Sequence, residues 1–559
     1  MLMSVSLDQL LTENYHLLTS RECQRRVLDF LSERESIRNL PILFVKRLTK
    51  VANHILVANP RALDRLVEKL YHFNMEGAAL VQSGKLSSNL DENIALLESH
   101  FCEHAGRAAK VCFKRNGDLA WVEKWYQAEK SGAELSVDVN PKHAAYAFGF
   151  AAEAARVLFK KTQGLHWAEK WYQAEKSGAE LSIDIEPEHA AYTFGFVAEA
   201  AKILYEYTNN LLWAEKWYKA DLLAAEMNSS RDQKYAVRCF IFGSDAADIL
   251  SEREIKTNLF KAKEWAEKSV EAKYAAVKLL MDTDLRAAAR YYSHIIEARQ
   301  KCFRLSEQIG SSNLEIEAER WHQSANSCLK LSQTTNLQRD DPRFIGYRYL
   351  DLANASQELS KLTQDCYWEE ERYYALGQAA DCFEQANNLA LAADNKNQQG
   401  HSARILADRC EHHRLDELAN YWRKVAYHDF KYSALQSKGF QRTHRFRRAG
   451  EAALNLFQNT ELSAPGTFYH KVLGFWHQLW GEKKDTSMAL DTSMALEAFD
   501  CFYRYVNFSA KNVPFPEFEK KAVELAETVQ QQIRYLETHP RMLESEQFQR
   551  RKNNLVHKI

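Results

Sequence analysis

The residues whose types could do chemistry at close range are two histidines and a glutamate within about one helical turn, His100, Glu103 and His104. Imidazoles at positions i and i+4 share a helix face, and with a glutamate between them they could hold a zinc ion and activate its bound water. A 46-residue repeat, described below, aligns His100 with Tyr146 and His104 with Phe150, which we interpret as aromatic packing positions. We therefore interpret both histidines as packing or surface residues, and we predict no metal site and no catalytic residue.

A second group of metal-ligating residue types, Cys410 to His413, has a poorer spacing. The adjacent His412 and His413 would point about 100° apart on a helix, so they do not converge on one ion. We interpret this group as a solvated helix end.

The most basic segment of the chain spans residues 438–448 and interleaves aromatic residues with four arginines, Arg442, Arg445, Arg447 and Arg448. Guanidinium groups at this spacing could clamp a carboxylate or a phosphate, or contact nucleic acid. The alternative, which we favour, is that they pair with acidic residues on neighbouring helices. The four arginines remain candidate partner-binding residues, while a net charge of −1 for the whole chain argues against a nucleic-acid partner.

Glycine-rich phosphate loops and nucleophile elbows do not occur in the sequence. The chain has only 19 glycines and 9 prolines among 559 residues, which favours long helices over the sharp turns that such sites need. We therefore predict a protein that is not an enzyme and uses no cofactor.

The sequence shows no pattern that would direct the chain out of the cytoplasm. The N-terminal segment lacks the basic and then apolar pattern of a signal peptide, and no stretch is apolar for long enough to span a membrane. The ten cysteines are scattered singly, which is typical of buried thiols in a reducing compartment. We expect a cytoplasmic protein, or one that acts in the cytosol of a host, without a membrane partner.

The elements that would position these side chains follow from an internal repeat of 46 residues. WVEKWYQAEKSGAELS begins at Trp121, WAEKWYQAEKSGAELS begins at Trp167, and WAEKWYKADLLAAEM begins at Trp213. A fourth copy takes about six extra residues in the turn before WAEK recurs at Trp265. Because chance does not produce fourteen consecutive identities at a fixed offset, we treat each copy as one structural unit.

Each unit is predicted to contain two helices. The first covers about residues 143–160, with Asn140 as its cap, and Gly164 breaks the chain before the second. The second helix starts near Trp167 and carries one apolar stripe. A lone pair cannot bury that stripe, so stacked pairs are expected to share a continuous core. We interpret the tryptophan that opens each second helix, at positions 121, 167 and 213, as part of this core.

The pairs carry glycine midway in the first helix, alanine early in the second, and tyrosine four residues after that alanine. In two successive copies these residues are Gly149, Ala168 and Tyr172, then Gly195, Ala214 and Tyr218. This pattern resembles tetratricopeptide repeats (TPRs), although the unit is longer than the usual length of about 34 residues. The resemblance implies an all-α fold, an α-solenoid of antiparallel helix pairs, whose first helices line a concave groove.

The resemblance also implies where a partner would bind. The candidate residues on the first helices are Lys142, His143, Arg156, His189 and Lys202. We expect a protein–protein interaction scaffold or adaptor that holds a peptide or partner protein in the groove. The alternatives are a regulator that senses a peptide or nucleic acid, a subunit that associates with itself, and, least favoured, a helical zinc hydrolase.

The helical pattern divides the chain into four predicted regions. These are an N-terminal helical cap over residues 1–97, the clear repeats over 98–282, diverged helical repeats over 283–462, and a C-terminal helical region with a basic tail over 463–559. No segment alternates polar and apolar residues, so we expect no sheet.

Overall fold

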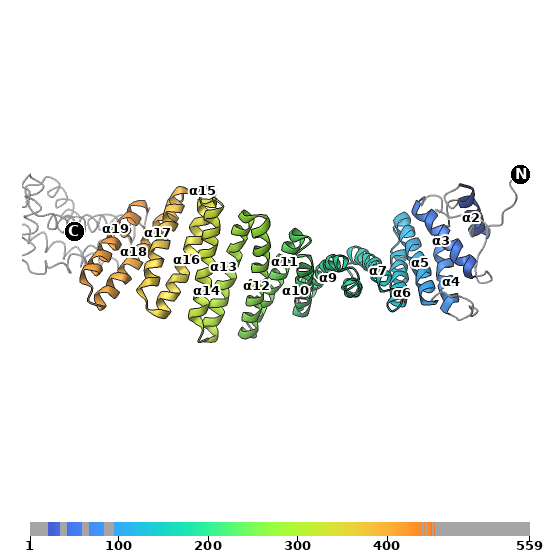
Figure 1. Ribbon diagram of the computed structural model, residues 1–559, viewed down its shortest axis with the longest axis horizontal. Coiled ribbons are helices and arrows are strands. Elements are labelled where there is room, and N and C mark those ends of the chain that lie inside the picture. The colour runs from blue at the N-terminus through green and yellow to red at the C-terminus, as the bar shows by residue number, and fades with distance from the viewer. Residues whose placement is uncertain are drawn as a thin grey trace, which may run out of the picture. The chain divides into compact units, whose positions relative to one another are not determined.

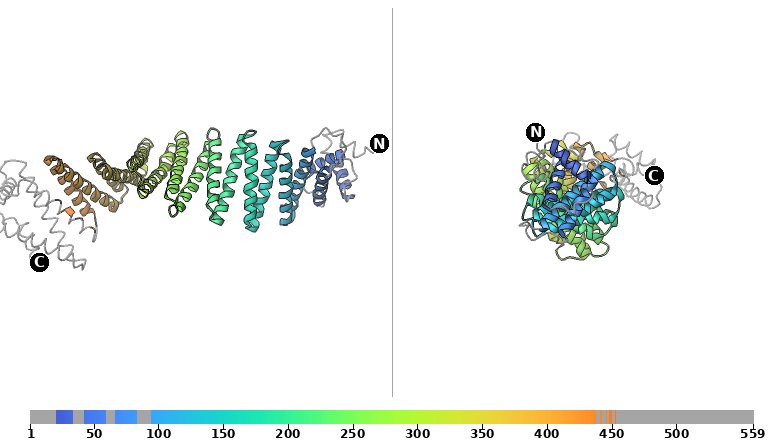
Figure 2. Two further views of the ribbon diagram at one scale, coloured as in Figure 1. Left: turned by 90° about the horizontal axis from the view of Figure 1, so that it is seen from below. Right: turned by 90° about the vertical axis from the view of Figure 1, so that its right-hand side faces the viewer.

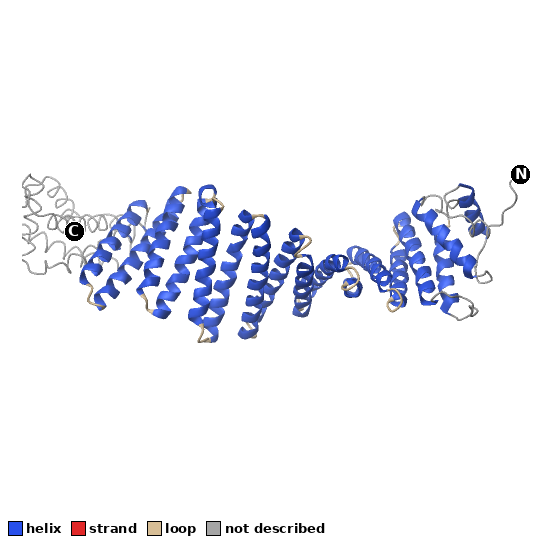
Figure 3. Cartoon of the chain, viewed as in Figure 1, coloured by secondary structure: helices blue, strands red, loops and turns tan. Residues whose placement is uncertain are grey.

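A computed structural model describes residues 21–33, 42–58, 66–82, 94–437, 441, 445, 448, 449 and 452. The predicted region 463–559 therefore lies outside the described residues. The chain separates into two compact units, Met1–Thr283 and Asp284–Ile559. Every regular element among the described residues is a helix, as Figure 3 shows, which confirms the all-α fold class. The finer division into four regions stays a prediction.

In the first unit, each helix packs against its neighbours in sequence, so that pairs stack side by side (Figure 1). The helices are α2 (Arg21–Glu33), α3 (Ile42–Ala58), α4 (Val67–Gln82), α5 (Ile94–Asn116), α6 (Leu119–Ser136), α7 (Pro141–Thr162), α8 (Leu165–Ser182), α9 (Pro187–Thr208), α10 (Leu211–Asn228), α11 (Gln233–Glu254) and α12 (Leu259–Thr283). We call α5, α7, α9 and α11 the first helices, and α6, α8, α10 and α12 the second helices. Their regular stacking is visible again in Figure 2.

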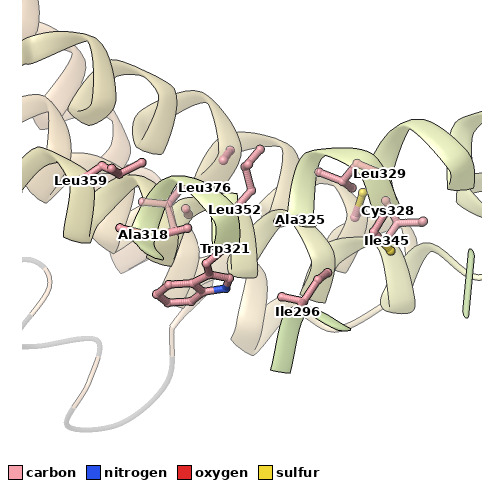
Figure 4. Close-up of a cluster of buried hydrophobic side chains, with 14 of the residues drawn as sticks. Ile296, Ala318, Trp321, Ala325, Cys328, Leu329, Ile345, Leu352, Leu359 and Leu376 are labelled. Carbon is pink, nitrogen blue, oxygen red and sulfur yellow. The ribbon is translucent and has the colours of Figure 1, made fainter. Parts of the chain in front are cut away.

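The second unit has the same kind of packing. Its helices are α13 (Leu285–Ile309), α14 (Leu314–Thr334), the short α15 (Leu337–Asp340), α16 (Pro342–Thr363), α17 (Cys366–Gln385), α18 (Leu389–His412) and α19 (Asp416–Gln436). Figure 4 shows part of its core, where Trp321 and Cys328 of α14 lie among Ile296 of α13 and Leu352 of α16.

The caps explain why the helices begin and end where they do. The Asn140 side chain accepts a hydrogen bond of 3.1 Å from the backbone N–H of His143, which confirms the predicted cap of α7. Gly164, however, is not the residue that ends α7. Gln163 takes the left-handed conformation at φ 55°, while Gly164 is extended and precedes α8. Sequence reasoning chose glycine because it adopts positive φ most readily, but a polar residue also adopts it at a single position.

Small residues allow the two helices of a pair to approach closely. A Cβ atom on Gly178 of α8 would lie 3.0 Å from the carbonyl oxygen of Ala145 in α7, which is tighter than ordinary contact. Trp171, about two turns before Gly178, is fully buried. The predicted shared core of stacked pairs is thus built from glycine and alanine contacts around one large ring per pair.

A second tryptophan joins each pair to the next. Trp167 meets Tyr126 of the preceding pair edge to face, with ring centres 5.4 Å apart, and Lys170 lies 4.0 Å above the Trp167 ring. The same joint recurs at Trp213 with Tyr172, and at Trp265 with Tyr218. Trp121 and Trp167 are buried as predicted, whereas Trp213 is partly exposed.

The fourth copy accommodates its extra residues differently from the prediction. Helix α12 begins at Leu259, six residues before Trp265, whereas α8 begins at Leu165, two residues before Trp167. Most of the insertion is therefore an added helical turn at the start of α12, and not a longer turn between helices. Helical hydrogen bonds satisfy the added backbone groups without a structured loop.

Two further features concern the whole described chain. None of its helices is both long and apolar enough to span a membrane. The cysteines whose side chains are described are free thiols, and all of these except Cys366 are buried. Burial of the thiols agrees with their positions inside apolar helical patterns.

Candidate functional site

A hollow of about 380 Å³ lies between two first helices, α9 and α11, with the second helix α10 as its floor. We call it the α9–α11 pocket. Residues from α9 that line it include Tyr192, Phe196, Glu199 and Lys202; α11 contributes Tyr235, Arg238, Cys239 and Phe242; and α10 contributes Trp217 and Asp221. The pocket thus combines aromatic rings with groups of both charges.

Helical periodicity places these side chains on one face. Tyr192, Phe196 and Glu199 stand at offsets of 0, 4 and 7, so they follow one side of α9. Tyr192 and Phe196 are 36% and 45% exposed, and their counterparts Tyr146 and Phe150 on α7 are 41% and 38% exposed. The interpretation of these aromatic positions as packing positions is thus correct only in part, since Tyr192 packs against Tyr235 with ring centres 4.8 Å apart while a third or more of each of these four residues stays exposed. The core of each helix pair is formed by other side chains, and the exposed parts of these rings remain accessible to a partner.

Two cations lie close to the aromatic rings of the pocket. The Lys202 Nζ atom is 5.2 Å from the centre of the Trp217 ring and 5.7 Å from that of Phe242. The Arg238 guanidinium carbon is 5.3 Å from the centre of the Phe242 ring. A cation over a ring face is attracted by the ring quadrupole, so both cations are held at the pocket wall. Lys202 is also 3.9 Å from Glu206, in an exposed ion pair that contributes little to stability.

The floor of the pocket contains a carboxyl group whose pKa is raised by burial. The Trp217 indole N–H donates a hydrogen bond of 2.6 Å to Asp221, and burial raises the pKa of Asp221 to about 8. The same pair occurs one copy earlier, where Trp171 donates to Glu175 at 3.3 Å and burial raises the pKa of Glu175 to about 8. At neutral pH the pocket therefore carries two cations, Lys202 and Arg238, against one exposed carboxylate, Glu199.

The two mid-helix glycines differ in what covers them. A Cβ atom on Gly195 would collide with the hydroxyl of Tyr235, whereas nothing lies within 4 Å of a Cβ atom on Gly149. The residue that corresponds to Tyr235 one copy earlier is His189, whose Nδ1 atom is 3.1 Å from the Ser182 hydroxyl. The smaller histidine, held by that serine, leaves the backbone at Gly149 open.

The structure brings only some of the predicted first-helix residues to this pocket. Lys202 lines it directly. Arg156 occupies the equivalent place one copy earlier, with its guanidinium carbon 5.8 Å from the centre of the Trp171 ring. Lys142, in the first turn of α7, instead forms an ion pair of 2.5 Å with Glu186. His143 and His189 point toward neighbouring side chains of the repeat, Glu103 and Ser182.

The basic segment belongs to the second unit. Arg445 is buried, and its guanidinium donates to the hydroxyls of Ser433 (3.1 Å) and Ser437 (2.6 Å) and to Asp394. Arg448 donates to Asn397 at 3.1 Å. Arg445 therefore pairs inside the unit, as the favoured alternative predicts, and does not present its charge to a partner. Arg442 and Arg447 lie outside the described residues.

The remaining histidine motifs lie outside the α9–α11 pocket. His412 and His413 are exposed at the end of α18, which confirms a solvated helix end, and Glu411 forms an ion pair with Arg423. His104 lines a separate hollow of about 310 Å³ between α3 and α5, together with Lys46 and Lys50.

Sequence reasoning missed the residues that give the pocket its character, above all Phe196, Arg238, Phe242 and Asp221. A signal was present, since phenylalanine recurs at positions 150, 196 and 242 at the repeat offset. A residue conserved among copies can serve the core or the surface, and the sequence alone did not separate these two roles.

Comparisons with known proteins give distant structural matches only. No protein-family model and no curated protein matches the chain. Similar solved structures include a circular tandem repeat protein with 13% identity, which covers 78% of this chain and 96% of that chain with a TM-score of 0.30. The stacked helix pairs of the structure itself give each unit the architecture of an α-solenoid.

Two further solved structures show the same distant similarity. A signal transduction ATPase with a tetratricopeptide repeat sensor, from Pyrococcus horikoshii, has 14% identity and a TM-score of 0.24, with 78% of this chain and 63% of that chain covered. A chain of the APC/C hetero-tetramer Cut9-Hcn1 has 12% identity and a TM-score of 0.20, with coverage of 80% and 97%.

Proposed function

We propose that this protein is a non-enzymatic cytoplasmic scaffold or adaptor, and that the α9–α11 pocket binds a peptide segment of a partner protein. The observation that carries this proposal is the row of exposed rings on the first helices, Tyr146, Phe150, Tyr192 and Phe196. Exposed aromatic groups at a hollow with polar surroundings are typical of interaction sites. The free, buried thiols support a reducing compartment.

The charges of the pocket indicate what kind of peptide fits. With Asp221 neutral, Lys202 and Arg238 exceed Glu199 by one positive charge, so an acidic group on the ligand is attracted. The rings of Phe196 and Phe242 offer an apolar wall beside these cations. We therefore infer a segment that presents an apolar side chain next to a carboxylate.

The pocket supports binding better than it supports catalysis. Its thiol, Cys239, is buried, and burial raises its pKa to about 12. A thiol that stays protonated at neutral pH is a weak nucleophile, since the thiolate is the reactive form. The residues that line the pocket thus favour non-covalent recognition.

A peptide-display selection on the full chain tests this function. We expect the selected peptides to share an apolar residue beside aspartate or glutamate, and Phe196→Ala to weaken their binding by about tenfold or more, as for an aromatic hot spot. Lys202→Glu should do the same by reversing the charge. The matched control is Lys176→Glu on α8, whose exposed ammonium pairs only with Glu180 in the same helix at 3.4 Å.

Three outcomes would contradict the proposal. Selected peptides that bind Phe196→Ala and the unmodified chain equally would place the site elsewhere. Equal losses in Lys202→Glu and Lys176→Glu would show general charge attraction. Binding of RNA in preference to peptides would instead support the nucleic-acid-sensing alternative.

A further inference from the structure

Three potential metal ligands lie close together where α5 and α7 meet. His100 and Glu103 belong to α5, and His143 belongs to α7. His100 Nδ1 and His143 Nε2 are each 3.7 Å from the same oxygen of Glu103, Oε2. One ligand atom from each of the three side chains lies within 4.8 Å of the other two.

The surroundings of this cluster favour an ion over an ordinary histidine contact. The Nε2 atom of His143 is buried and has no hydrogen-bond partner, which is unusual for a buried polar atom. The His100 and His143 rings meet edge to face with centres 5.1 Å apart, so both imidazoles are already turned toward one region. His100 is 40% exposed, which leaves an approach from solvent.

Arg107 completes the arrangement instead of blocking it. Its guanidinium binds Oε1 of Glu103, while both histidines face Oε2. A hydrogen-bonded partner on the outer oxygen orients a ligating carboxylate, as commonly found around protein metal sites. Arg107 therefore acts as a positioning residue for Glu103.

We propose that His100, Glu103 and His143 bind one divalent transition-metal ion, and that zinc suits this donor set best. Two imidazoles and one carboxylate are a common set of zinc ligands, with bonds of about 2.0–2.2 Å and a position left for water. The site differs from the histidine pair of the sequence motif, because the ligand atom that lies near those of His100 and Glu103 belongs to His143 of the next helix pair and not to His104. An ion held there would fasten α5 to α7.

The repeat supplies a natural control for this site. One copy later, the three equivalent positions hold Tyr146, Gly149 and His189. The histidine is kept, but the other two ligand types are absent, so this second location should not bind the ion. Because Gly149 faces open space, a glutamate side chain fits there without a backbone clash.

The experiment titrates Co²⁺, and then competing Zn²⁺, into the full chain purified without a polyhistidine tag and stripped of metal. We expect one equivalent of Co²⁺ to give the visible absorption of a protein-bound ion, which Zn²⁺ displaces. His143→Ala and Glu103→Gln should each abolish this band, and Arg107→Ala should lower the affinity by about tenfold. His189→Ala is the matched control and should leave the titration unchanged.

A gain-of-site variant keeps the test decisive if a loss variant fails to fold. Tyr146→His combined with Gly149→Glu recreates the three ligands around His189, and we expect it to bind a second equivalent of Co²⁺. Circular dichroism checks the helical content of each variant. The proposal is overturned if the unmodified chain gives no Co²⁺ band, if the band survives in Glu103→Gln, or if His189→Ala loses it as His143→Ala does.

Discussion

Two places in the first unit share one backbone design and differ in their chemistry. Between α5 and α7, three positions of the repeat hold His100, Glu103 and His143; 92 residues later, between α9 and α11, the same positions hold Tyr192, Gly195 and Tyr235. The first set gathers donor atoms around a carboxylate, and the second forms an aromatic wall over a covered glycine. The copy between them, with Tyr146, Gly149 and His189, combines features of both.

The comparison teaches that a few positions on the first helices give each copy its own side-chain chemistry. The positions that hold the pairs together hardly change: tryptophan is buried at 125, 171 and 217, and each has an acidic residue four positions later. Because the core does not depend on the three compared positions, the residues there are free to differ from copy to copy.

The largest expected effect separates these two classes of position. Trp171→Ala removes a fully buried ring and should lower the free energy of unfolding by about 3–5 kcal/mol. Phe150→Ala removes a ring of similar kind that is 38% exposed, and it should cost less than about 1 kcal/mol. Urea unfolding followed by circular dichroism measures both. Similar losses of unfolding free energy in the two variants would show that the Phe150 ring is part of the core.

An effect of intermediate size tests the protonation of the buried carboxyl group of Glu175. Burial raises the pKa of Glu175 to about 8, and Arg156, Glu153 and Glu199 are the charged groups that act on it. The folded chain therefore holds a proton that an unfolded glutamate releases above about pH 4.5. The contribution of Glu175 to stability is complete below that pH and falls as the pH rises to about 8, by up to about 1.4 kcal/mol per pH unit.

Glu175→Gln provides the measurement for this pH effect. The amide keeps the shape and an oxygen that can accept the hydrogen bond from Trp171, but it does not titrate. Urea unfolding at several pH values between 5 and 8 should give a shallower decline for the variant than for the unmodified chain. Equal slopes would mean that Glu175 is ionised in the folded protein.

The smallest expected effect compares the open and the covered glycine. Gly149→Ala should raise the free energy of unfolding by about 0.5–1 kcal/mol, because alanine favours the helix and its Cβ atom meets nothing. Gly195→Ala should lose that gain, because the Tyr235 hydroxyl must move. Adding Tyr235→Phe should restore part of it. If both alanine variants were stabilised alike, the cover over Gly195 would be mobile.

Local sequence signals predicted most of the helix pairs. The Asn140 cap, the 46-residue unit and the buried Trp167 all follow from spacing and residue type within one copy. The exact end of α7 did not, because Gln163 and Gly164 can each adopt the conformation that ends a helix.

The candidate sites were harder to predict, because they depend on contacts between copies. His143 meets Glu103 across 40 residues, and Arg445 meets Asp394 across 51. Such contacts depend on how one helix packs beside another, and helical periodicity says nothing about that register. The aromatic positions were assigned to the core because apolar character alone does not show which face a neighbouring helix covers.

The joints between second helices have a consequence for how the gene can change. The second helix of each copy contacts the preceding copy through a tryptophan and the next copy through a tyrosine, so every copy carries both halves of the contact. Duplication or loss of a whole 46-residue block would leave a tryptophan facing a tyrosine at the new boundary. Unequal recombination could therefore lengthen or shorten this part of the protein in a single event, and each product would inherit a complete joint.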